Sequence, residues 1–101
     1  MILKEGVVIG GIRPELLFAL NVCDAVYNAH GQELVITAIK DGKHSATSLH
    51  YSGCAADLRT RYFNANEAKV VAQEIRDRLG VDYDVILEKD HIHLEYQPKY
   101  R

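Results

Sequence analysis

The sequence has little of the features that mark several special classes of protein. Two cysteines, Cys23 and Cys54, stand among 101 residues, too few for the disulfide framework of a small secreted protein, and we expect two buried thiols. Seven glycines and two prolines exclude collagen-like and low-complexity chains. The formal net charge of -2 offers no excess of positive charge for nucleic acid or an anionic membrane, so we expect neither as a partner.

Long apolar runs are also missing. Residues 7–12 are apolar, but Arg13-Pro14-Glu15 interrupts them before residues 16–20 resume the pattern. A membrane span needs roughly 18 consecutive apolar residues, and a secretory signal needs an uninterrupted stretch followed by a small-residue cleavage site. We therefore expect one domain over residues 1–101 that is synthesised in the cytoplasm.

What is present predicts an α+β domain. Apolar residues recur at helical spacing from Pro14 to about Ala29. A second helix is expected to begin after Asn64, a good N-cap with Glu67 three residues on, and to end at Gly80. Short β-branched or alternating runs predict about four strands, near residues 34–39, 54–60, 83–87 and 91–96. Because the last two strands are adjacent in the sequence, we expect an antiparallel sheet.

Four of the five histidines fall in two short segments, His44 with His50 and His91 with His93. Alternate residues of a strand share a face, so His91 and His93 are expected to project from the same side. With a further His and an Asp from elsewhere, such a pair could supply ligands for zinc. A His-x-His pair is more often a partly exposed polar face, however, and periodicity alone does not connect His50 with Asp57.

A resemblance connects them. Residues 48–57 read Ser-Leu-His-Tyr-Ser-Gly-Cys-Ala-Ala-Asp, which resembles the Ser-x-His-x-x-Gly-x-Ala-x-Asp motif of the zinc D-Ala-D-Ala peptidases. That family includes D-alanyl-D-alanine carboxypeptidases, vancomycin-resistance D,D-dipeptidases and L-alanyl-D-glutamate endopeptidases of phage endolysins. Asp-His-Ile-His at 90–93 resembles the family's closing motif, and residues 41–57 are similar to the signalling domain of hedgehog proteins. The resemblance covers about residues 35–96 and implies the hedgehog/DD-peptidase fold.

The resemblance also implies a set of site residues. His50, Asp57 and His93 would hold one Zn²⁺, and His91 would lie beside the metal and stabilise the oxyanion. The family's general base is a carboxylate shortly before the last ligand. Asp90 stands three residues ahead of His93, and Glu88 is the rival.

Three further residues are expected near the substrate or behind the ligands: His44, Ser48 and Lys40. Many family members carry a Ser-Gly-Tyr-Arg-like segment before the first ligand, whose Arg contacts substrate. Residues 36–41 contain no Arg. Lys40 would then have to act as a point charge without the bidentate fork of an arginine.

These observations lead to two hypotheses of function. The first is a monomeric zinc metallopeptidase that cuts amide bonds in bacterial cell-wall peptides, of D-Ala-D-Ala or L-Ala-D-Glu type. The resemblance to endolysin peptidases suggests a phage or prophage protein that acts on the wall after release at lysis, or as a virion component. The alternative is a zinc-binding module without useful turnover, of the hedgehog type, whose metal site supports the fold or a partner surface.

Overall fold

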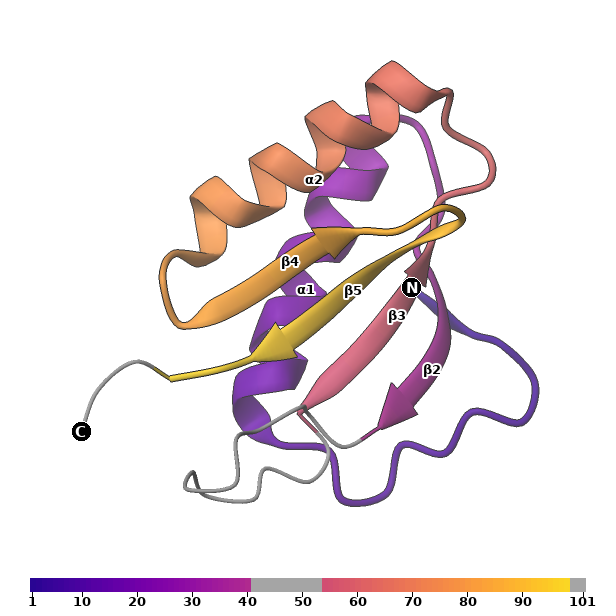
Figure 1. The fold of residues 1–101 in the computed structure, drawn as a ribbon. Coiled ribbons are helices and arrows are strands. Elements are labelled where there is room, and N and C mark those ends of the chain that lie inside the picture. Colours follow the sequence, from indigo (N-terminus) through magenta and orange to yellow (C-terminus); the bar gives the residue numbers. More distant parts are fainter. Residues whose placement is uncertain (41–53, 99–101) are drawn as a thin grey trace.

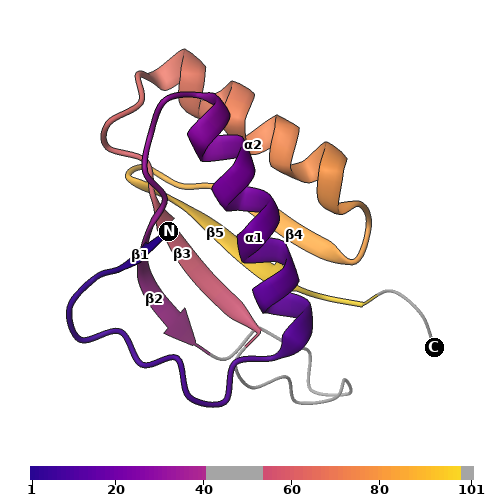
Figure 2. The same ribbon diagram turned by 180° about the vertical axis from the view of Figure 1, so that it is seen from behind.

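The structure is a computed structural model that describes residues 1–40 and 54–98. The predicted site residues His44, Ser48 and His50 lie outside these described residues. Within them, the elements follow in the order β1 (Ile2–Leu3), α1 (Pro14–Ala29), β2 (Val35–Lys40), β3 (Ala55–Arg59), α2 (Ala65–Leu79), β4 (Tyr83–Leu87) and β5 (His91–Tyr96). The strands form one sheet in the order β1-β2-β3-β5-β4, and both helices pack on the same face of it (Figures 1 and 2).

The α+β class is confirmed, but two details of the predicted sheet are wrong. Five strands are found in the described residues where about four were expected, and the sheet is mixed. The added strand is β1, which runs parallel to β2 through backbone hydrogen bonds from Ile2 N to Leu34 O and from Lys4 N to Ile36 O. A strand of two residues is too short for any periodicity in the sequence to reveal it.

Both helices have the boundaries that their capping residues predict. Pro14 occupies the first turn of α1, where its missing N–H leaves no hydrogen bond unmade. The Asn64 side chain accepts a hydrogen bond from Glu67 N at 2.8 Å at the start of α2, and Gly80 ends the helix with φ 79°. Because these signals are local, the sequence alone fixes them.

The core lies between the helices and one face of the sheet. Leu58 of β3 and Ile92 and Leu94 of β5 are fully buried against apolar side chains of both helices. Since side chains alternate along a strand, the residues between them point to the other face. By this alternation the polar residues Asp57, His91 and His93 lie on the face opposite the core. Both helices cover the core face of the sheet (Figure 1).

The expected burial of both cysteines is confirmed: Cys23 and Cys54 are each buried. Burial, with a smaller contribution from Asp24, raises the pKa of the Cys23 thiol to about 12. A thiol with such a pKa is unreactive at neutral pH. Among the described residues, neither helix is both long and apolar enough to cross a membrane.

Candidate functional site

Asp57 and His93 meet across the middle of the sheet. They are register partners in the antiparallel pair of β3 and β5. His93 Nδ1 lies 3.0 Å from Asp57 Oδ1, and His93 is only 8% exposed. Two residues that resemblance predicts as ligands of one metal are thus brought together from positions 36 residues apart.

His91 lies next to this pair on the same face of β5, as its spacing from His93 predicts. Its Nε2 is 3.8 Å from Asp57 Oδ1, and its Nδ1 is 2.8 Å from Asp90 Oδ1. Because β5 begins at His91, Asp90 belongs to the preceding turn and the alternation of the strand does not constrain its side chain. Asp90, His91 and Asp57 consequently form one continuous set of polar contacts.

Of the two carboxylates proposed as base, only Asp90 has a side-chain contact with this set in the described structure. Its side chain is 79% exposed, and its hydrogen bond with His91 lowers the pKa of the carboxyl below its usual value. Glu88 is exposed at the other end of the β4–β5 turn, where its backbone N donates to His91 O at 2.8 Å. The turn therefore places Asp90, and not Glu88, against His91.

Sequence reasoning missed Glu95. This residue is 3% exposed, and its Oε1 lies 2.9 Å from His93 Nε2. Gln97 Nε2 donates to its other oxygen. A carboxylate on one nitrogen of an imidazole fixes the ring and leaves the other nitrogen for a ligand. The signal was available, because Glu95 is two residues beyond His93 on the same strand face.

Lys40 lies on the far side of Asp57. Its Nζ donates a hydrogen bond to Asp57 Oδ2 at 3.1 Å. In the described structure Lys40 therefore contacts Asp57, which is one of the predicted metal ligands. Partial burial by itself would raise the pKa of Asp57, but the hydrogen bonds from His93 and Lys40 outweigh it and lower the pKa below its usual value. Asp57 is held as a carboxylate at neutral pH.

The separation of the two predicted ligand atoms is that of a hydrogen bond, and it is also close to the spacing of two ligands on one zinc. Two ligand atoms bound to one tetrahedral zinc, each about 2.0–2.1 Å from the metal, are about 3.3 Å apart, close to the 3.0 Å between Asp57 Oδ1 and His93 Nδ1. Within residues 1–40 and 54–98, no three His, Cys, Asp or Glu side chains are grouped so as to hold a metal by themselves. The third predicted ligand, His50, lies outside those residues.

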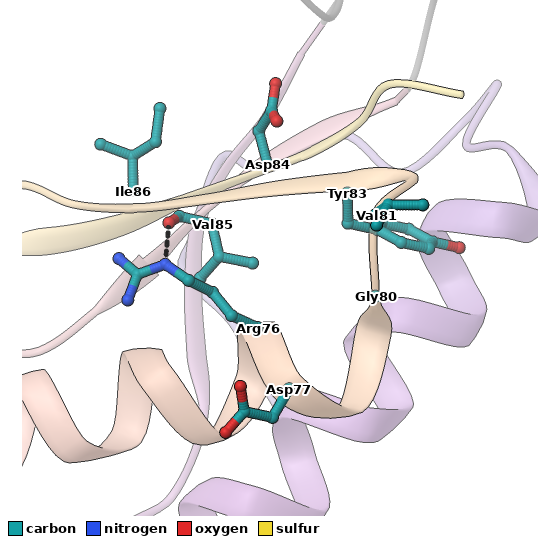
Figure 3. Close-up of a pocket in the computed structure, with 8 residues that line it drawn as sticks. All are labelled: Arg76, Asp77, Gly80, Val81, Tyr83, Asp84, Val85 and Ile86. Carbon is teal, nitrogen blue, oxygen red and sulfur yellow. Dashed lines mark hydrogen bonds between the residues drawn. The ribbon is translucent and has the colours of Figure 1, made fainter. Parts of the chain in front are cut away.

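A cavity of about 310 Å³ opens beside these contacts. It is lined by residues of β2, β3 and β5, of the segments that follow β1 and β3, and of the β4–β5 turn: Lys4, Thr37, Asp57, Arg59, Arg61, Asp90 and His91. A larger cavity, of about 540 Å³, lies between the end of α2 and β4. Figure 3 shows Arg76 there, with its Nε donating to Val85 O. No predicted site residue lines that larger cavity.

The outer face of the sheet thus gathers imidazole and carboxylate groups, which can orient a ligand and accept a proton, and Asp57 and His93 there are the chemical types that coordinate metals. Neither the protein-family models nor the curated proteins with which the sequence was compared match this chain.

Proposed function

We propose that this protein is a zinc metallopeptidase that hydrolyses amide bonds in bacterial cell-wall peptides of D-Ala-D-Ala or L-Ala-D-Glu type. The observation that carries the proposal is the 3.0 Å approach of Asp57 Oδ1 and His93 Nδ1, with the Asp90–His91 pair beside it on the wall of one cavity. The motif over residues 48–57 supports it from the sequence. The site residues project from the face of the sheet opposite both helices, and this arrangement supports a hedgehog/DD-peptidase type of fold.

In this proposal His50, Asp57 and His93 hold one Zn²⁺. The chemistry that zinc supplies in such a site is acidification of a water molecule and polarisation of a carbonyl group. Glu95 holds the His93 ring through Nε2, so Nδ1, which contacts Asp57 in the structure, would be the atom that binds the metal. Lys40 holds Asp57 from the other side.

Asp90 is the proposed general base, with Glu88 as the rival. Asp90 accepts a proton from water as the water oxygen forms a bond to the amide carbonyl carbon. When the carbon–nitrogen bond breaks, Asp90 returns that proton to the leaving amine, and the products are an acid and an amine. His91, held by Asp90, donates a hydrogen bond to the oxyanion between these steps. The hydrogen bond from His91 lowers the pKa of the Asp90 carboxyl further below neutrality, so Asp90 is ionised at neutral pH and can accept a proton.

A second candidate is a zinc-binding module without turnover. The burial of His93 and Glu95, 8% and 3% exposed, favours it, because buried ligands are also typical of metal sites that stabilise a fold. The exposed Asp90 carboxylate beside an open cavity favours the enzyme.

The first test is zinc content together with hydrolysis of purified peptidoglycan, for wild type and His50→Ala. The expected result is one zinc per chain and new free amines, with both lost in the variant. His30→Ala is the control, because His30 contacts Glu74 of α2 at 3.1 Å and is not part of the site. Zinc without cleavage would favour the binding module, and no zinc in wild type would exclude the site.

For its place of action, we propose synthesis in the cytoplasm and action of the monomer on the wall after release, or as part of a virion. The test is lysis of permeabilised cells by added protein. Failure to lyse them, with purified peptidoglycan still cut, would count against this placement and leave the activity intact.

A further inference from the structure

The cavity of about 540 Å³ between α2 and β4 runs along one edge of the sheet. The strand order places β4 at this edge, with β5 as its neighbour among the described strands. The strand at the opposite end of the order, β1, has two residues, whereas β4 has five. An edge strand presents a row of N–H and C=O groups with which another strand can pair. Of the two terminal strands, β4 is therefore the one long enough to bind a further strand.

The hydrogen bonds to β5 show which backbone groups of β4 face outward. Just outside the strand, Gln97 N donates to Asp82 O at 2.7 Å, and Glu88 N donates to His91 O at 2.8 Å. Residues bonded to the partner strand alternate with residues whose N–H and C=O groups point away from it. Since residues 82 and 88 are both bonded toward β5, the groups that point away belong to the odd-numbered residues of β4: Tyr83, Val85 and Leu87.

Arg76 of α2 occupies the middle of this free edge. Its Nε donates to Val85 O at 2.8 Å, and Figure 3 shows the guanidinium group beside that carbonyl. Arg76 Nη1 also donates to Gln73 Oε1 at 3.2 Å, and Gln73 Nε2 donates to Asp77 Oδ1 at 2.9 Å. The guanidinium is thus held where the N–H group of a further strand would have to lie.

A second copy of β4 fits the same edge. In an antiparallel pair of two β4 strands centred on Val85, the three outward-facing residues of one copy meet the same three of the other. Such a contact is symmetric and closes after two copies. Within the strand it opposes no like charges, because Asp84 faces Ile86 of the second copy, a side chain that is 47% exposed. Beyond the strand Glu88 would face Asp82 of the second copy, and this repulsion adds to the protection by Arg76.

We propose that the free edge of β4 is a surface through which two copies of this chain can pair, and that Arg76 keeps it closed in the monomer. Two copies pair fully only after Arg76 has released Val85 O. The inference does not rest on the proposed function, because Arg76 is not among the residues that line the cavity beside Asp57 and His91.

The test is the self-association of Arg76→Met, which keeps a long side chain but has no hydrogen-bond donor. Sedimentation velocity over a series of protein concentrations measures the dissociation constant of the dimer, and circular dichroism checks that each protein is folded. The matched control is Arg78→Met, because Arg78 lies on the same helix and pairs there with Glu74 at 3.0 Å.

We expect wild type and Arg78→Met to stay monomeric. Arg76→Met should dimerise with a dissociation constant at least about tenfold lower than that of wild type, because one hydrogen bond no longer has to be broken before pairing. Equal association of Arg76→Met and wild type, or equal association of Arg76→Met and Arg78→Met, would overturn the proposal.

Charge at position 86 tests whether the dimer forms through β4 in the stated register. Ile86→Glu added to Arg76→Met places a carboxylate opposite Asp84 of the second copy, twice in each dimer, and should weaken the dimer by about threefold or more. Ile86→Lys added to Arg76→Met should strengthen it by a similar factor, because opposite charges then face each other. If both substitutions change the dissociation constant in the same direction, the β4 pair is wrong.

Amide hydrogen exchange of wild type tests the edge without any variant. The N–H groups of Val85 and Leu87 should exchange faster in the monomer than those of Asp84 and Ile86, which are bonded to β5. In Arg76→Met the Val85 N–H should become protected as the protein concentration rises. Equal protection of Val85 and Asp84 in the wild-type monomer would show that the edge is not free and would overturn the proposal.

Discussion

At the scale of single residues, the geometry of the site is set by hydrogen bonds between its side chains. Asp57 lies between His93 and Lys40, and His93 lies between Asp57 and Glu95. The resemblance implied that Asp57 and His93 are ligands of one metal. Their side chains lie 3.0 Å apart in the structure, and the role of both as ligands stays a prediction. Glu95 was missed although its spacing from His93 places both residues on one strand face. The pairing of Lys40 with Asp57 was not predicted, because no local pattern states which side chain a lysine contacts.

The two candidate bases can be separated by single substitutions. We expect Asp90→Ala to reduce kcat by about 10²-fold or more, since general acid–base catalysis contributes about 10²–10⁴-fold, while zinc content stays at the wild-type value. Glu88→Ala should retain most of the activity, because its side chain makes no described contact with the site. Zinc analysis and steady-state hydrolysis of a cell-wall peptide measure both effects. Full activity in Asp90→Ala would remove its assignment.

Acid should weaken the metal-free fold through Asp57. Its pKa in the folded protein is below the usual value, so its ionised form contributes stability at pH values above the unfolded-state pKa of about 4. That contribution is lost as the pH falls through the folded-state pKa. Urea unfolding between pH 2.5 and about pH 7 with a chelator present should show a smaller acid-side loss in Asp57→Asn. An identical loss in variant and wild type would contradict the prediction.

At the scale of elements, α1 and α2 were predicted with the observed boundaries, and β4 and β5 likewise. Their signals are carried by neighbouring residues: a proline in the first turn of α1, an Asn N-cap and a Gly C-cap for α2, a short apolar run in β4 and alternation in β5. β1 was missed, and with it the mixed sheet. Its two residues are held by hydrogen bonds to a strand more than 30 residues away, and nothing within β1 itself encodes that pairing.

The Asn64 cap gives a prediction for α2. Asn64→Ala removes the acceptor for Glu67 N, which lies 2.8 Å from Asn64 Oδ1, and should lower the free energy of unfolding by about 1 kcal/mol. Asn64→Asp should keep most of the stability, because a carboxylate accepts the same bond. Urea denaturation of the three proteins is the measurement. Equal midpoints for the Ala and Asp variants would show that the cap contributes nothing.

At the scale of the whole molecule, the two faces of the sheet have different roles, one in the stability of the fold and the other in the proposed chemistry. One face buries the core against two helices in the described structure, and the other carries the proposed site. β5 serves both faces at once, since Leu94 belongs to the core and Glu95 contacts His93. Substitutions at adjacent residues of this strand should therefore affect different properties, the free energy of unfolding for one and zinc binding for the other.

This division can be tested with a matched pair. Leu94→Ala, which removes a fully buried side chain, should lower the free energy of unfolding by about 2–5 kcal/mol and leave one zinc bound at a temperature where the protein is folded. Glu95→Gln should weaken zinc binding by about 10–100-fold. Chemical denaturation and competition with a zinc chelator measure the two effects. Equal zinc affinity in Glu95→Gln and wild type would exclude the orienting role of Glu95.

The sequence by itself determined the α+β class, the ends of both helices and the common face of His91 and His93, because capping and a period of two act between neighbours. Three relations depend on the tertiary structure alone. Asp57 pairs with His93 across two strands, Lys40 donates a hydrogen bond to Asp57, and Lys4 lines the same cavity as Arg59. Those relations depend on the register of β3 with β5 and with β2, and on the pairing of β1 with β2. Register is set by how the whole apolar face packs on the helices, and a short stretch of sequence does not contain it.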